Sequence, residues 1–264
     1  MNMSRMLIKL LKTVLVFFLL FSNIYASQKE LYPEESMQKN SVVITGVTKG
    51  LGRALVSEFA KQGWKIAGCG RSLKMIQELQ KEYGPEHIFS VVDVTNNASV
   101  ATWVHEISEK IGTPTILITN AALINHPNVL WKVQPSEFSK IMETNVIGVF
   151  NVLHHFIPLM IEQEKGLIIN ISSSSGVEGD KEFAPYCTSK FAIEGLTQSL
   201  AQELPKGLSV VSLDPGGINT DMLYTAYQES ANDYPSPEQR AKLIVPYILN
   251  INHKDNGRHL VAPY

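Results

Sequence analysis

Tyr186 and Lys190 are the two residues whose types and spacing most directly suggest chemistry. They stand four positions apart, so on a helix their side chains share one face, one turn from each other. An ammonium beside a phenol favours the phenolate and is expected to lower the tyrosine pKa from its usual value of about 10. The spacing alone is a weak signal, because Tyr25 and Lys29 repeat it near the N-terminus. The residues around Tyr186 and Lys190 must therefore show whether this pair is catalytic.

Ser173 and Asn145 are expected to join this pair. Residues 166–175 read GLIINISSSS, a strand running directly into serines, and Ser173 precedes Tyr186 by 13 positions. Asn145 lies in an apolar helical stretch, where a buried amide needs a partner. We predict that Tyr186 protonates a developing alkoxide while Ser173 donates a hydrogen bond to it. Asn145 is predicted to position a water that links Lys190 to solvent. The plainer alternatives are a serine-rich loop and a satisfied core amide.

A glycine-bearing turn follows the first predicted strand. Residues 45–52 read TGVTKGLG, and Leu51, Leu55 and Phe59 then recur with helical spacing. Glycines at such a turn let backbone N–H groups approach a pyrophosphate at a helix N-terminus. The spacing differs from the Walker pattern, because no Gly-Lys-Ser/Thr follows. The turn therefore predicts a dinucleotide site, with an ordinary glycine-rich turn as the alternative.

The end of the second predicted strand indicates which dinucleotide binds. An enzyme that uses NAD places a carboxylate there for the ribose 2′-hydroxyl, whereas this chain has Gly70-Arg71-Ser72. Arg71 offers a fork of donors to a 2′-phosphate, and Lys49 is expected to approach the same phosphate from the glycine turn. We therefore predict NADPH/NADP+ as the cofactor.

Short apolar runs alternate with amphipathic stretches from residue 41 onward. Such alternation predicts an α/β fold with a single Rossmann-type, doubly wound parallel sheet and helices on both faces. Ligands of such a sheet bind beyond the carboxyl ends of its strands, where most of the residues above stand. The predicted strands are 41–45, 65–69, 88–92, 115–119, 167–171 and 208–213.

Composition narrows the class of protein. The 264 residues are 44% hydrophobic and carry a net charge of −2, so the chain has enough apolar residues for a core and no basic excess for nucleic acid. The two cysteines, Cys69 and Cys187, are too few for a disulfide scaffold and lack metal-ligand spacing, so no metal site is predicted. Cys187 is expected to pack rather than react.

The N-terminal residues differ from the rest. Residues 1–26 combine basic residues, an apolar run and a small residue at Ala26, as in a signal peptide or membrane anchor. Residues 27–40 read as a linker, and 41–264 as the NADP-binding domain. The localisation stays open: export or membrane attachment through this segment, or a cytoplasmic protein if it is unused or translation starts at Met37.

These motifs together resemble the short-chain dehydrogenase/reductase family from about residue 41 to the C-terminus. The resemblance implies a catalytic tetrad of Asn145, Ser173, Tyr186 and Lys190, and an oxidoreductase that commonly forms homo-oligomers. One departure is Ala122, where the family usually has glycine. The implied cofactor-binding residues are Thr45, Gly46, Thr48, Lys49, Gly50, Leu51, Gly52, Arg71, Asp93, Val94, Asn120, Ala121, Tyr186, Lys190, Pro215, Gly216, Ile218 and Thr220.

Within the family, residues 129–160, 184–196 and 214–223 look similar to the plant NADPH-dependent pterin aldehyde reductases. This implies a small-molecule carbonyl substrate, a pterin aldehyde or another aromatic aldehyde, that is reduced to an alcohol. Two alternatives remain: a 3-oxoacyl or hydroxysteroid-type reductase on the same fold, and a non-catalytic NADP-binding sensor. All four tetrad positions are filled, which argues against the sensor.

Residues 218–239 form a long, polar segment in which aromatic residues are interleaved. Such a segment suits a lid over a substrate, with Met222, Tyr224 and Tyr227 stacking on a flat ring. The alternative is a surface loop without substrate contact.

Overall fold

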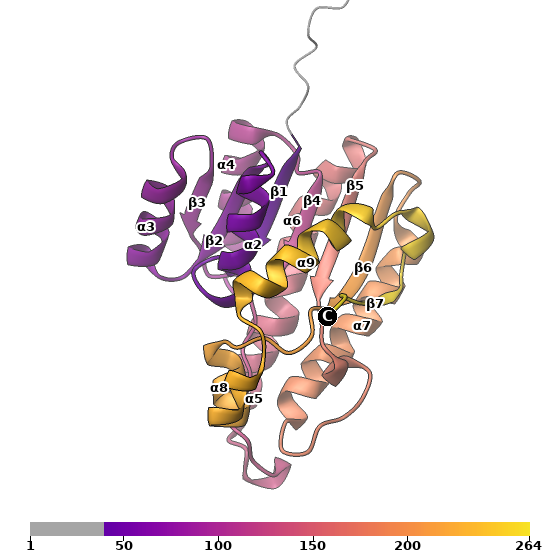
Figure 1. Cartoon of the computed structure of the whole chain (residues 1–264). Coiled ribbons are helices and arrows are strands. Elements are labelled where there is room, and N and C mark those ends of the chain that lie inside the picture. Colours follow the sequence, from indigo (N-terminus) through magenta and orange to yellow (C-terminus); the bar gives the residue numbers. More distant parts are fainter. Residues whose placement is uncertain (1–39) are drawn as a thin grey trace, which may run out of the picture. The chain divides into compact units, whose positions relative to one another are not determined.

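The computed structural model describes residues 40–264, and these are built around one seven-stranded sheet (Figure 1). All neighbouring strands pair in parallel, in the order β3-β2-β1-β4-β5-β6-β7. The predicted parallel sheet is confirmed. Its strands are β1 (Ser41–Thr45), β2 (Lys65–Gly70), β3 (Ile88–Val91), β4 (Ile116–Thr119), β5 (Gly166–Ile171), β6 (Leu208–Asp214) and β7 (His259–Val261).

The sequence pattern missed one strand. The bounds of β1 to β6 agree with the six predicted runs to within one residue at each end. In contrast, β7 is only three residues long, which is too short to show any periodicity. It forms because β6 offers an open edge, on which Ser212 pairs with His259 and Asp214 with Val261.

Helices cover both faces of the sheet, as predicted (Figure 1). Leu55, Ile76 and Ile244 pack on one face from α2, α3 and α9, respectively. Trp103, Phe156 and Ile193 pack on the other from α4, α6 and α7. The bounds are α2 (Gly50–Lys61), α3 (Leu73–Tyr83), α4 (Asn97–Ile111), α5 (Pro135–Met142), α6 (Gly148–Glu162), α7 (Ala184–Glu203), α8 (Asp221–Tyr227) and α9 (Pro237–Asn250).

The stretch 135–162 is long and apolar. It comprises α5, a π-helical turn (Glu143–Ile147) and α6, and within residues 40–264 it alone has the length and composition to cross a membrane. Half of its most apolar 18-residue window is buried, however, and Val152, Phe156 and Met160 of α6 belong to the core. Packing against the sheet therefore accounts for its apolar composition.

The strand order reverses beside β1. The chain runs from β1 outward to β2 and β3, and then returns to place β4 on the other side of β1. Loops leave the carboxyl ends of β1 and β4 in opposite directions at this point, which opens a crevice. In Figure 1 the strands run downward, and α5 and α8 lie beyond their lower, carboxyl ends.

The predictions for the N-terminus lie almost wholly outside the described residues. The compact unit begins at Asn40, directly before β1. The signal-peptide or anchor segment 1–26 and the linker 27–40 stay predictions, apart from Asn40, which is exposed.

We expect the Trp103→Ala variant to destabilise the fold. Trp103 is 1% exposed, and its ring meets that of Phe156 edge to face at 5.6 Å between centroids. The free energy of unfolding should fall by about 3 kcal/mol, which is the lower end of the range for replacing a buried aromatic residue by alanine. The lower end applies because the indole N–H of Trp103 has no hydrogen-bond partner among residues 40–264, so its removal breaks no hydrogen bond. Urea unfolding followed by circular dichroism measures the free energy of unfolding.

Trp131→Ala is the matched control, because Trp131 is 83% exposed. Its unfolding free energy should stay within about 0.5 kcal/mol of the original protein. Equal losses in the two variants would contradict the packing described here.

Candidate active site

A cavity of about 730 Å³ lies at the carboxyl ends of the strands. Its volume is within the range of small-molecule sites in proteins. The walls come from the β1–α2 turn, the ends of β2 to β6, the start of α7 and the α8 segment. The cavity therefore lies where the reversal of strand order predicts a ligand.

The glycine turn brings backbone groups close to one another. Gly46 has a φ of 74°, and a Cβ there would lie 2.9 Å from the Cα of Ala121. A Cβ on Gly52 would collide with the carbonyl oxygen of Gly46 and lie 2.6 Å from the Asn120 amide nitrogen. Side chains at these two positions would push apart the turn that forms one wall of the cavity.

Like α5 and α7, helix α2 begins without a side-chain cap. Its first residues, Gly50 to Gly52, line the cavity. Unpaired N–H groups and the positive end of the helix dipole favour a negatively charged group there. This cradle fits the predicted pyrophosphate.

Thr45 differs from its prediction as a cofactor contact. Its side chain is buried and does not line the cavity. The hydroxyl instead accepts hydrogen bonds from the backbone N–H groups of Asn120 and Ala121, at 2.9 and 3.0 Å. Thr45 thus joins the ends of β1 and β4, which fixes the floor beneath the cavity.

The other predicted cofactor contacts all line the cavity, although their roles stay predictions. Ala122, the departure from the family pattern, lines it as well. The lining residues among those predicted are Gly46, Thr48, Lys49, Gly50, Leu51, Gly52, Arg71, Asp93, Val94, Asn120, Ala121, Tyr186, Lys190, Pro215, Gly216, Ile218 and Thr220.

The two cations predicted to select the cofactor have different surroundings. The Lys49 ammonium forms an ion pair with Asp221 at 2.8 Å, and both side chains are exposed. Arg71 lies in the cavity wall just after β2. Because an exposed ion pair is weak, both cations stay available to a phosphate at this end of the cavity.

Ser173, Tyr186 and Lys190 converge on the cavity wall. Tyr186 and Lys190 lie on successive turns of α7, and the Lys190 ammonium is 5.5 Å from the centre of the tyrosine ring. The ammonium donates a 2.8 Å hydrogen bond to the carbonyl oxygen of Ile171, the last residue of β5. Ser173 follows two residues later and lines the same cavity as Tyr186 and Lys190. Three of the four predicted catalytic residues therefore lie in one cavity wall.

The sign of the Tyr186 pKa shift was predicted incorrectly. Burial raises this pKa above its ordinary value, and the hydrogen bond from Ser173 offsets only part of the effect. Burial also lowers the pKa of Lys190 to about 8, while the nearby carboxylates of Glu194 and Asp214 raise it. Burial is thus the largest cause of both pKa shifts, and the carboxylates of Asp214 and Asp180 add to the rise at Tyr186. A phenol with a raised pKa holds its proton at neutral pH, which suits a proton donor.

Asn145 lies behind the cavity rather than in its wall. Its amide exchanges hydrogen bonds with the backbone N–H and carbonyl of Leu123, at 2.7 and 2.8 Å, and donates to the Ser189 hydroxyl at 2.9 Å. These partners use both amide protons and one of the two acceptor positions of the oxygen. The predicted water on this side chain stays a prediction. Asn145 ties the segment after β4 to α7.

The predicted lid is helical rather than a loop. Residues 218–239 include α8 and a 3₁₀ segment (Gln228–Asp233). Met222 and Tyr227 line the cavity, and the Tyr227 ring lies 6.1 Å from that of Phe183. Tyr224 does not line it and donates to Glu229 instead. Two of the three residues predicted to contact a ring thus line the cavity.

Cys187 is buried beside Phe183 and Tyr186, in agreement with a packing role. Its thiol accepts a 3.2 Å hydrogen bond from the backbone N–H of Asp180. Within residues 40–264 no cluster of three or more His, Cys, Asp or Glu side chains is arranged to hold a metal ion.

Sequence reasoning overlooked several residues of the site. Asp180 lines the cavity and accepts a 2.5 Å hydrogen bond from the Ser175 hydroxyl. Asp214 ends β6 and accepts from the N–H of Gly216 at 2.8 Å. Glu194, four residues after Lys190, continues the catalytic face of α7. Its spacing was the one available signal, since Asp180 and Asp214 stand in no pattern.

Comparisons with known proteins agree with this geometry. A model of the short chain dehydrogenase family matches residues 40–231. The NADPH-dependent pterin aldehyde reductase of Arabidopsis thaliana is 45% identical over 224 residues, which are 84% of this chain and 93% of that protein. The chain belongs to the short-chain dehydrogenase family.

Two other proteins extend the comparison. A 3-oxoacyl-acyl-carrier-protein reductase of Haemophilus influenzae is 32% identical over 187 residues, covering 70% of this chain and 77% of its own length. The solved structure of ElxO with NADP bound is 26% identical, with a TM-score of 0.77, and the match covers 84% of this chain and 96% of ElxO. Relatives of this chain thus carry names that give different substrates.

We expect Gly52→Ala to weaken dinucleotide binding at least about tenfold, because the new methyl group would separate the glycine turn from the Asn120 amide. Fluorescence titration with NADPH measures the dissociation constant. In the control Gly195→Ala, an added Cβ meets nothing within 4 Å on α7. That variant should bind normally, and normal binding by Gly52→Ala would contradict the close approach.

Proposed function

We propose that this protein is an NADPH-dependent reductase that converts an aldehyde or ketone to an alcohol, with Tyr186 as the proton donor. The observation that carries the proposal is the convergence of Tyr186, Ser173 and Lys190 on one cavity with the glycine turn. A binding protein for NADP would need the cradle alone. The buried phenol and ammonium add acid–base chemistry to it.

The chain's own groups supply geometry and a proton. The bound nicotinamide supplies the hydride. Tyr186 gives its phenolic proton to the carbonyl oxygen as that oxygen gains negative charge, and Ser173 donates a hydrogen bond to the same oxygen. Lys190, mostly an ammonium below pH 8 because burial sets its pKa to about 8, stabilises the phenolate that Tyr186 leaves behind. Burial strengthens both effects, since the site excludes much of the surrounding water.

Three observations support NADPH as the cofactor. No carboxylate follows β2, where an NAD site would need one for the ribose. Arg71 lies in the cavity wall at that point. The Arabidopsis relative is named as NADPH-dependent, and the solved structure of ElxO has NADP bound.

An aromatic aldehyde, with a pterin aldehyde as the leading example, is the proposed substrate. The substrate end of the cavity is lined by Met222, Tyr227 and Ile124, with Phe183 packed behind Tyr227. Such side chains bind a flat ring through stacking and apolar contact. The 45% identity to a pterin aldehyde reductase over most of both chains points in the same direction.

A 3-oxoacyl thioester is the second candidate, because a reductase of that class is 32% identical over 187 residues. Loss of NADPH absorbance, measured with aromatic aldehydes, oxoacyl thioesters and steroids in parallel, separates the two. A kcat/KM at least about tenfold higher for the aldehydes supports the first candidate, and the reverse order replaces it with the second.

Tyr186→Phe should lower kcat by about 10²–10⁴-fold, because the ring keeps its shape but loses the proton that the alkoxide needs. NADPH binding should persist, and titration checks it in the same preparation. The control is Tyr247→Phe, which removes a hydroxyl from a half-buried tyrosine of α9 outside the cavity. A Tyr186→Phe enzyme with normal turnover would refute the assignment.

Arg71→Ala should raise the KM for NADPH by about 10–100-fold, the effect of losing hydrogen bonds to a phosphate. The KM for NADH should hardly change, since NADH lacks the 2′-phosphate. Lys74→Ala is the control, because it removes an exposed positive charge close by on α3 that does not line the cavity. Equal changes for NADPH and NADH in Arg71→Ala would show that Arg71 does not read the phosphate.

A further inference from the structure

Glu194 is a buried carboxylate that the reaction described above does not use. It lies on α7, eight residues after Tyr186 and four after Lys190, so the three side chains form one stripe along the helix. Glu194 is only 5% exposed. A carboxylate buried to this degree needs several hydrogen bonds or a counter-charge, and its surroundings explain why it is there.

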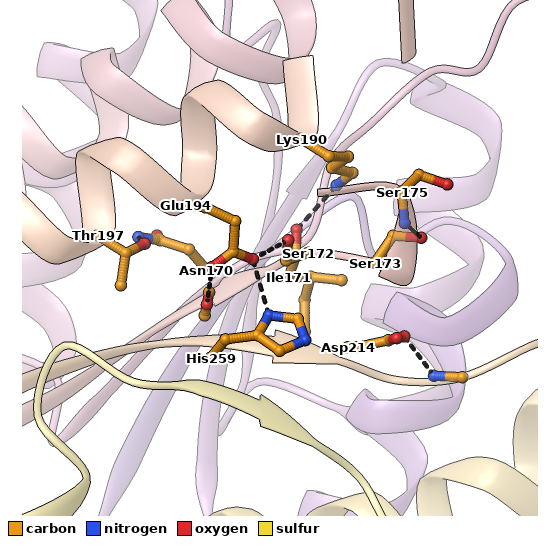
Figure 2. Close-up of polar contacts among 12 residues, drawn as sticks. Asn170, Ile171, Ser172, Ser173, Ser175, Lys190, Glu194, Thr197, Asp214 and His259 are labelled. Carbon is orange, nitrogen blue, oxygen red and sulfur yellow. Dashed lines mark hydrogen bonds and ion pairs between the residues drawn. The ribbon is translucent and has the colours of Figure 1, made fainter. Parts of the chain in front are cut away.

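Three polar side chains converge on the Glu194 carboxylate, and Figure 2 shows the contacts of two of them, Ser172 and His259. The Ser172 hydroxyl donates to Oε1, which His259 Nδ1 meets at 2.9 Å. The Ser212 hydroxyl donates to Oε2 at 2.6 Å. A carboxylate accepts at both oxygens and donates at neither, which matches this arrangement. A glutamine would turn an NH₂ group toward one of these donors.

These three partners come from β6, β7 and the residue that follows β5. Ser172 directly follows β5, while Ser212 and His259 lie in β6 and β7 and pair with each other in the sheet. Glu194 therefore joins α7 to the ends of the strands that carry Ser173 and the Pro215–Gly216 turn. The turn after Ser173 also rests on Glu194, because a Cβ on Gly176 would lie 3.2 Å from Glu194 Cγ.

Apart from Glu194, few groups stabilise the positive charge of Lys190. The one hydrogen bond that its ammonium makes within residues 40–264 goes to a neutral carbonyl, that of Ile171. The ionisable groups around it are Tyr186 and Glu194 on α7, Asp214 on β6 and, beyond Glu194, His259 on β7. Of the two carboxylates, Glu194 has the larger effect on the pKa of Lys190, and it acts against burial.

We propose that Glu194 is a positioning residue of this active site, which supplies the counter-charge for the Lys190 ammonium and fixes the ends of β5, β6 and β7 against α7. The inference rests on the proposed function only where it makes Lys190 part of the reaction. The charge effect itself is a property of the folded chain and is measurable without turnover.

The decisive experiment is an NMR titration of the full chain with labelled lysine, in which Lys190→Arg assigns the Lys190 signal. In the original protein Lys190 should titrate near pH 8, the value set by burial. In Glu194→Gln, the loss of the negative charge should lower the Lys190 pKa by about one unit or more. An unchanged titration overturns the proposal.

Thr197→Val is the matched control. Thr197 is buried one turn further along α7, where its hydroxyl accepts from the Asn170 amide at 2.9 Å. The substitution removes a buried hydrogen bond from the same face without removing a charge, so the Lys190 pKa should stay where it is. An equal shift in this variant would mean that general disturbance of α7, and not the Glu194 charge, moves Lys190.

Two further measurements keep the test decisive. If Glu194→Gln does not fold, the carboxyl ¹³C signal of Glu194 in the original protein tests the proposal instead: a carboxylate at pH 7 supports the proposal, and a protonated acid overturns it.

Where carbonyl reduction is observed, the alkaline limb of the pH profile of kcat should move to lower pH in Glu194→Gln, by the same amount as the Lys190 pKa. An inactive original protein would refute the proposed function, whereas the lysine titration would still test Glu194.

Discussion

Lys190 is 3% exposed, and the cost of burying its charge constrains much of the site around it. The carbonyl of Ile171 accepts from it, and the carboxylates of Glu194 and Asp214 oppose its loss of charge. Tyr186 shares the same helix face, so its phenol is held beside the ammonium. The position of α7 against β5 and β6 therefore decides whether these groups meet.

A second constraint is the narrow space at the end of β1. Glycines at positions 46 and 52 let the turn approach Asn120 and Ala121, and the Thr45 hydroxyl fixes that approach from below. The reversal of strand order at β1 places this turn and the start of α7 around one cavity. The sheet thus brings together a cradle for a dinucleotide and an acid–base pair that are far apart in the sequence.

Much of this was predictable from the sequence, and the failures have physical reasons. Apolar runs locate β1 to β6 because buried parallel strands are continuously apolar, whereas β7 depends on the open edge of β6 and has no pattern of its own. Motif spacing finds Tyr186 and Lys190, but it does not indicate how deeply they are buried. The predicted direction of the Tyr186 pKa shift was therefore wrong. The roles of Thr45 and Asn145 depend on hydrogen bonds to distant backbone groups, which a linear pattern does not contain.

A single-turnover experiment tests the central claim most directly. The purified full chain is mixed with one equivalent of NADPH and an excess of an aromatic aldehyde, and the loss of NADPH is compared with the alcohol formed. The account predicts one alcohol for each NADPH oxidised. NADPH that binds tightly but stays reduced with every aldehyde, oxoacyl thioester and steroid offered would contradict it.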